Sequence, residues 1–269
     1  MAAHSSAVGA LLRDWRHRRR LSQLALACDA EISPRHLSFL ETGRSAPSRE
    51  MILHLSEQLR IPLRERNSLL VAGGYAPLFL ERPLDAPALE AARKAIDLVL
   101  TGHEPYPALA IDRHWNLLAS NRVVPLLLAG ADPSLLRQPI NVLRLSLHPG
   151  GLAPRIINLE EWRTHLLERL ARQIDVTADE TLIDLMKELR DYPTVSAAAG
   201  RRVPRKADYA GVVVPLELSV GRDVFAFFSA TTVFGTPVDI TLSEIALESF
   251  FPADSTTAEL LRHASGGPA

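Results

Sequence analysis

The chain has 269 residues, of which 47% are hydrophobic and 23% are charged. This composition is typical of a globular protein and excludes an intrinsically disordered chain, and the length suggests one large domain or two smaller ones. The longest apolar run, 123–131, contains Pro125 and is far shorter than the roughly 20 residues that span a bilayer, so we expect no membrane segment. Cys28 is the single cysteine, which excludes an intramolecular disulfide. The residues after Met1 lack a secretory pattern, and both observations favour a reducing cytoplasm.

Charge is distributed unevenly along the chain. Residues 1–80 hold 11 Arg and 7 Asp or Glu, a net charge of +4, whereas the other 19 basic and 24 acidic residues give −5. A basic small domain followed by a larger acidic one predicts that nucleic acid binds at the N-terminal end only.

The first 75 residues predict five short helices. The first carries Val8, Leu11, Leu12 and Trp15 on one face and ends in the basic run 16–20, which either contacts DNA or is merely solvated. Serine hydroxyls are placed to cap the next three helices, a proline opens the fifth, and Gly43 ends the third. These residues are Ser22, Ser33, Ser48 and Pro62. On the second to fourth helices, the residues expected to face the core are Leu24, Ala25, Ala27, Cys28, Leu37, Leu40, Ile52, Leu55 and Leu59.

Residues 76–87 contain Pro77, Pro83 and Pro87 and are predicted to form a semi-stiff linker. The chain is thus expected to have two domains, 1–75 and 88–269. The second is expected to be an α+β domain with an antiparallel sheet, in which Pro215 marks an edge or a bulge. Its predicted elements are a helix at 88–101, a hairpin of strands 107–112 and 115–120, a mostly helical middle with helices at 160–174 and 180–190, and strands at 212–220, 224–234 and 241–251.

Two segments of the first domain carry the motif that predicts function. Residues 22–27 read Ser-Gln-Leu-Ala-Leu-Ala, and residues 32–44 read Ile-Ser-Pro-Arg-His-Leu-Ser-Phe-Leu-Glu-Thr-Gly-Arg. Both resemble the Xre/Cro-type helix-turn-helix family, whose lambda-repressor-like domain is all-α with five helices. The resemblance implies double-stranded DNA as a partner, with the second helix across the DNA backbone and the third in the major groove. The same module also occurs in antitoxins and other binding proteins.

Since Leu37 and Leu40 must face inward, the opposite side of the third helix is expected to face DNA. Arg35 is either a surface arginine or a base-reading residue, because a guanidinium pairs with guanine O6 and N7, and Phe39 could press against a thymine methyl. His36 and Ser38 are expected to touch phosphate or sugar. The family places phosphate contacts at Gln23 and Arg44, and often a glutamine where this chain has Pro34. The candidate DNA-contacting residues are Gln23, Ser33, Pro34, Arg35, His36, Ser38, Phe39 and Arg44.

The second domain is similar to the MmyB-like ligand-binding domain, which has a PAS-like fold. The similar residues are 112–121, 141–144, Pro149, Trp162 and the late strands. The resemblance implies a small apolar ligand, such as a fatty acid, between sheet and helices. The candidates for its apolar part are Trp115, Leu117, Ala119, Phe225 and Phe227, and for its carboxylate Arg144 and His148. Each aromatic side chain could equally be ordinary core, and Arg144 could instead pair with an Asp or Glu of its own domain.

Together these features predict a ligand-responsive transcription regulator that acts as a homodimer on two half-sites. No glycine-rich phosphate loop or hydrolase motif is present, so we expect no catalytic residues, no metal and no cofactor beyond the apolar ligand. In the alternative interpretation, the second domain is a protein-interaction or dimerisation module without a ligand. An enzyme regulated by its own DNA-binding domain would require a polar cleft with convergent titratable groups.

Overall fold

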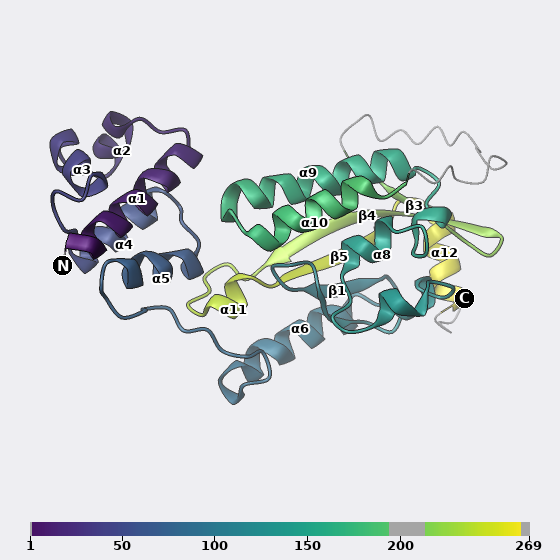
Figure 1. The fold of residues 1–269 in the computed structure, drawn as a ribbon. Helices are drawn as coiled ribbons and strands as arrows, with labels where there is room; N and C mark the ends of the chain where they lie inside the picture. Colours follow the sequence, from purple (N-terminus) through teal and green to yellow (C-terminus); the bar gives the residue numbers. More distant parts are fainter. Residues whose placement is uncertain (1, 194–212, 265–269) are drawn as a thin grey trace. The chain divides into compact units, whose positions relative to one another are not determined.

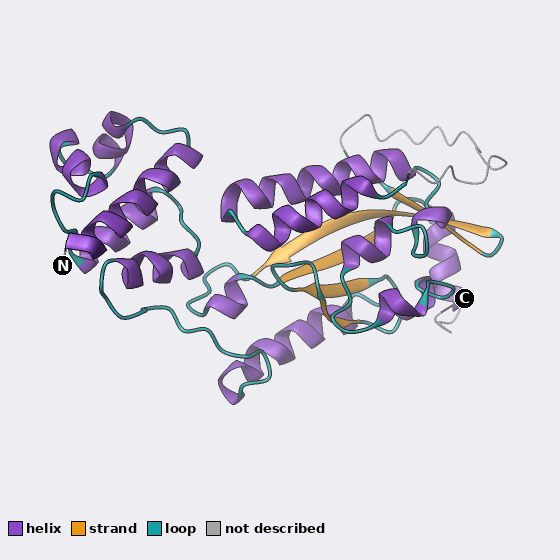
Figure 2. Cartoon of the chain, viewed as in Figure 1, coloured by secondary structure: helices purple, strands orange, loops and turns teal. Residues whose placement is uncertain are grey.

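The computed structural model describes residues 2–193 and 213–264, and the chain forms two compact units, each with its own helices (Figure 1, Figure 2). The first unit comprises Met1–Arg82 together with two short segments from later in the chain, Gln173–Ala178 and Pro237–Ser243. The second unit comprises Pro83–Arg172, Asp179–Thr236 and Glu244–Ala269.

The N-terminal part of the first unit has the five predicted helices. They are α1 (Ala2–Arg18), α2 (Gln23–Asp29), α3 (Pro34–Glu41), α4 (Arg49–Gln58) and α5 (Leu63–Ala72). The three serine caps are confirmed, because each hydroxyl accepts a hydrogen bond from a backbone N–H of the first turn. The donor–acceptor distances are 3.0 Å for Ser22, 3.1 Å for Ser33 and 3.2 Å for Ser48.

One apolar core holds the five helices together. Most of the residues predicted to face inward do so, but Leu11 is 37% exposed, Leu24 is 61% exposed, and Cys28 is exposed. For α2 the prediction is confirmed for Ala27 but wrong for Leu24 and Cys28, which lie on the side opposite the buried Leu26. The buried residues of this core are Val8, Leu12, Trp15, Leu26, Ala27, Ala30, Leu37, Leu40, Ile52, Leu55, Leu59, Ile61, Leu69 and Leu70.

The second unit has a sheet of five strands in the order β2-β1-β5-β4-β3, all paired antiparallel. The strands are β1 (Ala108–Ile111), β2 (Leu117–Ser120), β3 (Leu216–Val220), β4 (Asp223–Val233) and β5 (Ala246–Pro252). The predicted α+β, PAS-like sheet domain is thereby confirmed, and Pro215 precedes an edge strand as expected. Residue 212, where the first late strand was expected to begin, lies outside the described residues.

Helices lie before, between and after the strands of this sheet. In Figure 1, α9 and α10 lie along one side of the sheet, and Arg169 of α9 bonds to Thr231 of β4 and Glu248 of β5. The helices are α6 (Glu90–Gly102), α7 (Val124–Leu127), α8 (Val142–Leu147), α9 (Leu159–Thr177), α10 (Glu180–Asp191) and α12 (Ser255–Ala264). The short helix α11 (Ile240–Ser243) precedes β5 in the chain but belongs to the first unit. Three 3-10 helices occupy Pro87–Leu89, Pro133–Leu136 and Ala153–Arg155.

Two predicted strand boundaries are wrong for the same physical reason, an aspartate that caps a turn. The strand expected at 241–251 begins only at Ala246, because Asp239 accepts a hydrogen bond from Thr241 N (2.9 Å) and starts the short helix α11. The strand expected at 115–120 begins at Leu117. Asp112 accepts bonds from the backbone N–H groups of residues 114 and 116, both at 2.8 Å, and Trp115 adopts a positive φ of 66° in that turn.

Candidate DNA-binding and ligand-binding sites

The geometry of α2 and α3 is that of a helix-turn-helix. After α2, Glu31 takes a positive φ of 52° and turns the chain, and Ser33 with Pro34 opens α3. Leu37 and Leu40 have no exposed surface, so they fix which side of α3 faces the core. Gly43, with a φ of 71°, ends the helix in the left-handed conformation that glycine adopts without strain.

Seven of the predicted DNA contacts lie in α3 or next to its ends, and Gln23 is the first residue of α2. Ser33, Pro34, Arg35 and Arg44 are exposed, whereas Gln23, His36, Ser38 and Phe39 are half-buried. Several of these side chains already make contacts within the protein, among them the Ser33 hydroxyl that caps α3. The ring of Phe39 lies beneath two guanidinium groups, and the amide of Gln23 donates a hydrogen bond to Glu41 (2.8 Å). The role of each residue in binding DNA remains a prediction.

A buried ion pair fixes α3 against α1, and the sequence interpretation missed it. Arg16 donates two hydrogen bonds to Glu41, from Nε at 2.6 Å and from Nη2 at 2.8 Å, and the two side chains are 8% and 1% exposed. The hydrogen bond from Arg16 to Glu41 raises the pKa of Arg16. Burial alone would raise the pKa of Glu41, but bonds from Arg16 and Gln23 outweigh burial and hold it below its ordinary value.

This arrangement changes the interpretation of the basic run 16–20. Arg16 is neither a DNA contact nor a solvated residue, because its guanidinium is buried in this pair. Through Glu41, it also orients Gln23 at the first position of α2. The spacing from Val8 and Leu12 to Arg16 was a signal that could have placed Arg16 on the buried face of α1.

In the second unit, the apolar ligand candidates lie in or beside the sheet. Phe225 and Phe227 are stacked with ring centroids 6.2 Å apart, and Phe227 has no exposed surface. Leu117 and Ala119 lie half-buried on the edge strand β2. Trp115 is buried in the hairpin turn. The structure therefore places these residues in one sheet domain but not side by side, because β1 and β5 lie between β2 and β4.

The polar ligand candidates form a cluster of their own. Arg144 of α8 is bonded to Glu188 of α10 (2.7 Å), and Tyr192 also donates to Glu188, so the arginine has a carboxylate partner in its own domain. The bond to Glu188 raises the pKa of Arg144, and the same bond lowers that of Glu188. The ring of His148 lies edge-on to Tyr192 with centroids 5.0 Å apart.

A second ion pair, also missed from the sequence, lies between α9 and the sheet, and it joins the half-buried Arg169 to the buried Glu248. Arg169 Nη2 is 2.6 Å from Glu248 Oε1, and its guanidinium carbon lies 4.9 Å from the centroid of the Trp115 ring. Thr231 donates to the same carboxylate at 2.8 Å. The Arg169 guanidinium is thus the cation that contacts Trp115, one of the predicted apolar ligand residues.

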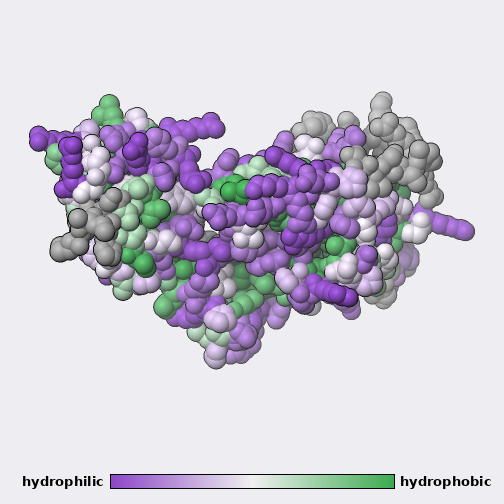
Figure 3. All heavy atoms as spheres, viewed as in Figure 1, coloured by the Kyte–Doolittle hydropathy of each residue, from purple (hydrophilic) through white to green (hydrophobic). Residues whose placement is uncertain are grey.

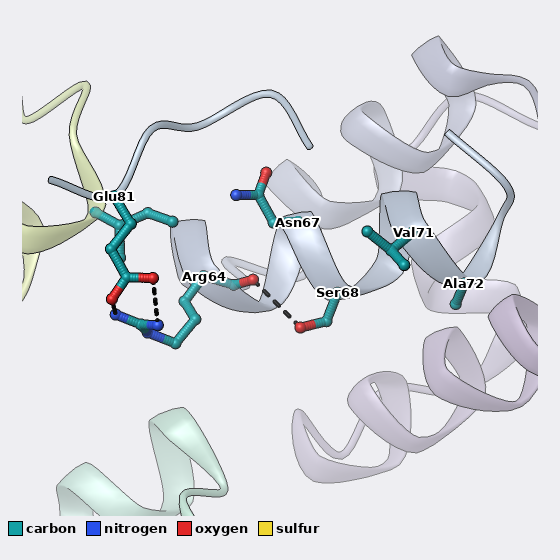
Figure 4. Close-up of a pocket in the computed structure, with 7 residues that line it drawn as sticks. Arg64, Asn67, Ser68, Val71, Ala72 and Glu81 are labelled. Carbon is teal, nitrogen blue, oxygen red and sulfur yellow. Dashed lines mark hydrogen bonds and ion pairs between the residues drawn. The ribbon is translucent and has the colours of Figure 1, made fainter. Parts of the chain in front are cut away.

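An open hollow of about 480 Å³ lies along α5 in the first unit (Figure 4). Arg64 and Glu81 face each other across a bidentate ion pair, and Asn67, Ser68 and Val71 line the helix side. None of the predicted DNA-binding or ligand-binding residues lines it. On the face drawn in Figure 3, hydrophilic residues cover most of the surface and hydrophobic ones form small separate patches. No helix within residues 2–193 and 213–264 is long and apolar enough to cross a membrane.

Comparison with known families agrees with this geometry. Residues 7–69 match the family described as a Helix-turn-helix domain, which places the chain in the helix-turn-helix class of DNA-binding proteins. Residues 92–264, more than half of the chain, match the MmyB-like transcription regulator ligand binding domain. The chain belongs to this family: it is a DNA-binding transcription regulator with a ligand-binding domain. Both families are binding modules rather than enzymes, and the curated proteins contain no match.

Proposed function

We propose that this regulator binds a specific operator as a homodimer and responds to a small apolar ligand such as a fatty acid. The observation that carries the DNA-binding half is the exposed face of α3. Leu37 and Leu40 fix its buried side, and Arg35 projects from the opposite side, where a guanidinium can reach base edges in a major groove. Two such helices in a dimer would enter successive grooves about 34–36 Å apart.

Selection of random duplexes by the full chain tests the specificity. We expect a site with two half-sites, on which Arg35→Ala weakens binding by roughly 1–3 kcal/mol and relaxes the preference at one base pair. Arg44→Ala should weaken specific and random DNA alike and flatten the salt dependence. Arg222→Ala is the matched control, since it removes an exposed arginine from the β3–β4 turn of the other unit. An equal loss for Arg35→Ala on specific and random DNA would remove Arg35 from base reading.

The family itself supports the ligand-sensing half, together with the buried aromatic side chains of the sheet. Phe225, Phe227 and Trp115 offer apolar surface, while Arg144 could take a ligand carboxylate only by releasing Glu188. Mass spectrometry of an organic extract of the purified full chain is the test. We expect one apolar carboxylic acid in stoichiometric amount, retained by the Arg222→Ala control.

The second candidate function is a protein-interaction or dimerisation module without a ligand. It is favoured by the full burial of Phe227 and by the internal pairing of Arg144 with Glu188, which leave these groups satisfied by their own domain. An extract that matches that of an unrelated protein, together with a stable dimer, would support this function instead.

A further inference from the structure

The ring of Phe39 is flanked by two arginines that belong to different parts of the chain. The guanidinium carbon of Arg35 lies 5.3 Å from the ring centroid, and that of Arg44 lies 5.8 Å from it. Arg35 precedes Phe39 by one helical turn of α3, whereas Arg44 follows the helix after the turn at Gly43. One aromatic side chain thus contacts both the predicted base-reading cation and the predicted phosphate-binding cation.

Neither arginine is held by an acidic group. Within the described residues, no carboxylate lies within ion-pair distance of Arg35 or Arg44, and no hydrogen bond fixes either guanidinium. Other arginines of the same unit are anchored differently: Arg16 has Glu41, and Arg64 has Glu81. Within the part of the chain that the structure describes, these two long side chains are therefore restrained by their contact with the Phe39 ring.

The physical effect of such a contact is preorganisation. An aromatic face attracts a guanidinium through the ring quadrupole, and it does so without using the N–H groups that would bond to DNA. A free arginine loses much of its rotamer freedom when it binds, so restraint in advance lowers the entropic cost of the complex. Contact with one ring also holds two like charges in defined positions, although they repel each other.

We propose that Phe39 is a positioning residue that presets Arg35 and Arg44 for DNA, rather than a residue that contacts a thymine methyl group. The inference rests on the proposed DNA-binding function and deepens it. The half-buried position of Phe39 is consistent with this role, because the ring faces the two guanidinium groups and is not left bare on the recognition surface.

The test compares Phe39→Leu with Phe39→Tyr in the full chain on the selected operator. Tyrosine keeps the aromatic face and should bind within about 2-fold of the wild type. Leucine removes the face and should weaken specific binding roughly 5- to 30-fold, or about 1–2 kcal/mol at 1.4 kcal/mol per tenfold. In an Arg35→Ala, Arg44→Ala background the leucine substitution should have almost no further effect, since its targets are absent.

Operator DNA in which deoxyuridine replaces thymidine separates the two roles of Phe39, because only the C5 methyl group is lost. If Phe39→Leu weakens binding by the same factor on both DNAs, the result supports the positioning role. The positioning role would be overturned if Phe39→Leu no longer weakened binding to the methyl-free DNA. It would also be overturned if the substitution weakened binding by the full factor in the Arg35→Ala, Arg44→Ala background.

A measurement on the free protein covers the case in which Phe39→Leu does not fold or no DNA is selected. The side-chain protons of Arg35 and Arg44 should show ring-current shifts in the NMR spectrum of the wild type and of Phe39→Tyr. Absence of these shifts would refute the contact itself. Failure to select any DNA, with the shifts present, would instead contradict the proposed function.

Discussion

The buried pair of Arg16 and Glu41 makes the sharpest prediction about stability. In Arg16→Met the carboxyl of Glu41, only 1% exposed, loses its cation and is expected to take up a proton. Protonation costs about 1.4 kcal/mol for each pH unit above an unfolded-state pKa of about 4.3, which is about 4 kcal/mol at pH 7 and about 1 kcal/mol at pH 5. The destabilisation should therefore shrink as the pH falls.

Glu41→Gln provides the contrast, because Arg16 cannot lose its proton in this range. Glu41→Gln should therefore lower the stability by a similar amount at pH 5 and pH 7. In the wild type the lowered pKa of Glu41 means that its contribution is fully present above the unfolded-state pKa and is lost as the pH falls through the folded-state value. The DNA-binding region should thus loosen only in more acidic solution.

Hydrogen exchange of α1 and α3 peptides in the full chain, corrected for intrinsic rates, measures the free energy of opening of this region alone. The assignment of a buried charge pair would be refuted if Arg16→Met lowered the free energy of opening by the same amount at pH 5 and pH 7. It would also be refuted if the decrease at pH 7 stayed below about 1 kcal/mol.

Three further predictions concern close packing, a buried amide and the second ion pair. In Gly9→Ala the new Cβ would collide with the backbone oxygen of Leu40, so we expect about 1–3 kcal/mol of destabilisation in thermal unfolding and weaker DNA binding. Gly102→Ala is the control, because its Cβ would meet no neighbouring atom within 4 Å, and it should be neutral or stabilising. Asn121→Ala removes bonds to the carbonyls of residues 100 and 106, and urea unfolding should show a loss of about 2–4 kcal/mol that Ser120→Ala lacks. Arg169→Met leaves the Glu248 carboxylate without its cation and should destabilise the sheet domain by about 3–5 kcal/mol at pH 7. An unchanged midpoint of unfolding would contradict the burial of Glu248 as a charged group.

Features that depend on neighbouring residues in the chain could be predicted from the sequence. The serine caps of α2, α3 and α4 each involve a hydroxyl and an N–H three residues later, and all three were found at the expected positions. The hairpin of β1 and β2 was likewise evident from its alternation and its turn. Local hydrogen bonding determines such elements, and the sequence displays both partners.

Features that depend on distant partners could not be predicted. Glu41 lies 25 positions from Arg16, and Glu188 lies 44 positions from Arg144, so neither pairing is visible in a linear pattern. The orientation of α2 was misjudged because tertiary packing decides which side of a seven-residue helix is buried. The contact between Phe39 and Arg44 was likewise not visible in the sequence, because it depends on how the chain turns after α3.

The coupling between ligand and operator tests the central claim most directly. The Kd of the full chain for its selected operator is measured with and without the extracted apolar ligand, and the Kd for the ligand with and without operator. A ligand-responsive regulator predicts a change of about 5- to 150-fold in the operator Kd and the same factor in the ligand Kd, because binding linkage is reciprocal. Saturating ligand that leaves the operator Kd unchanged would contradict the account.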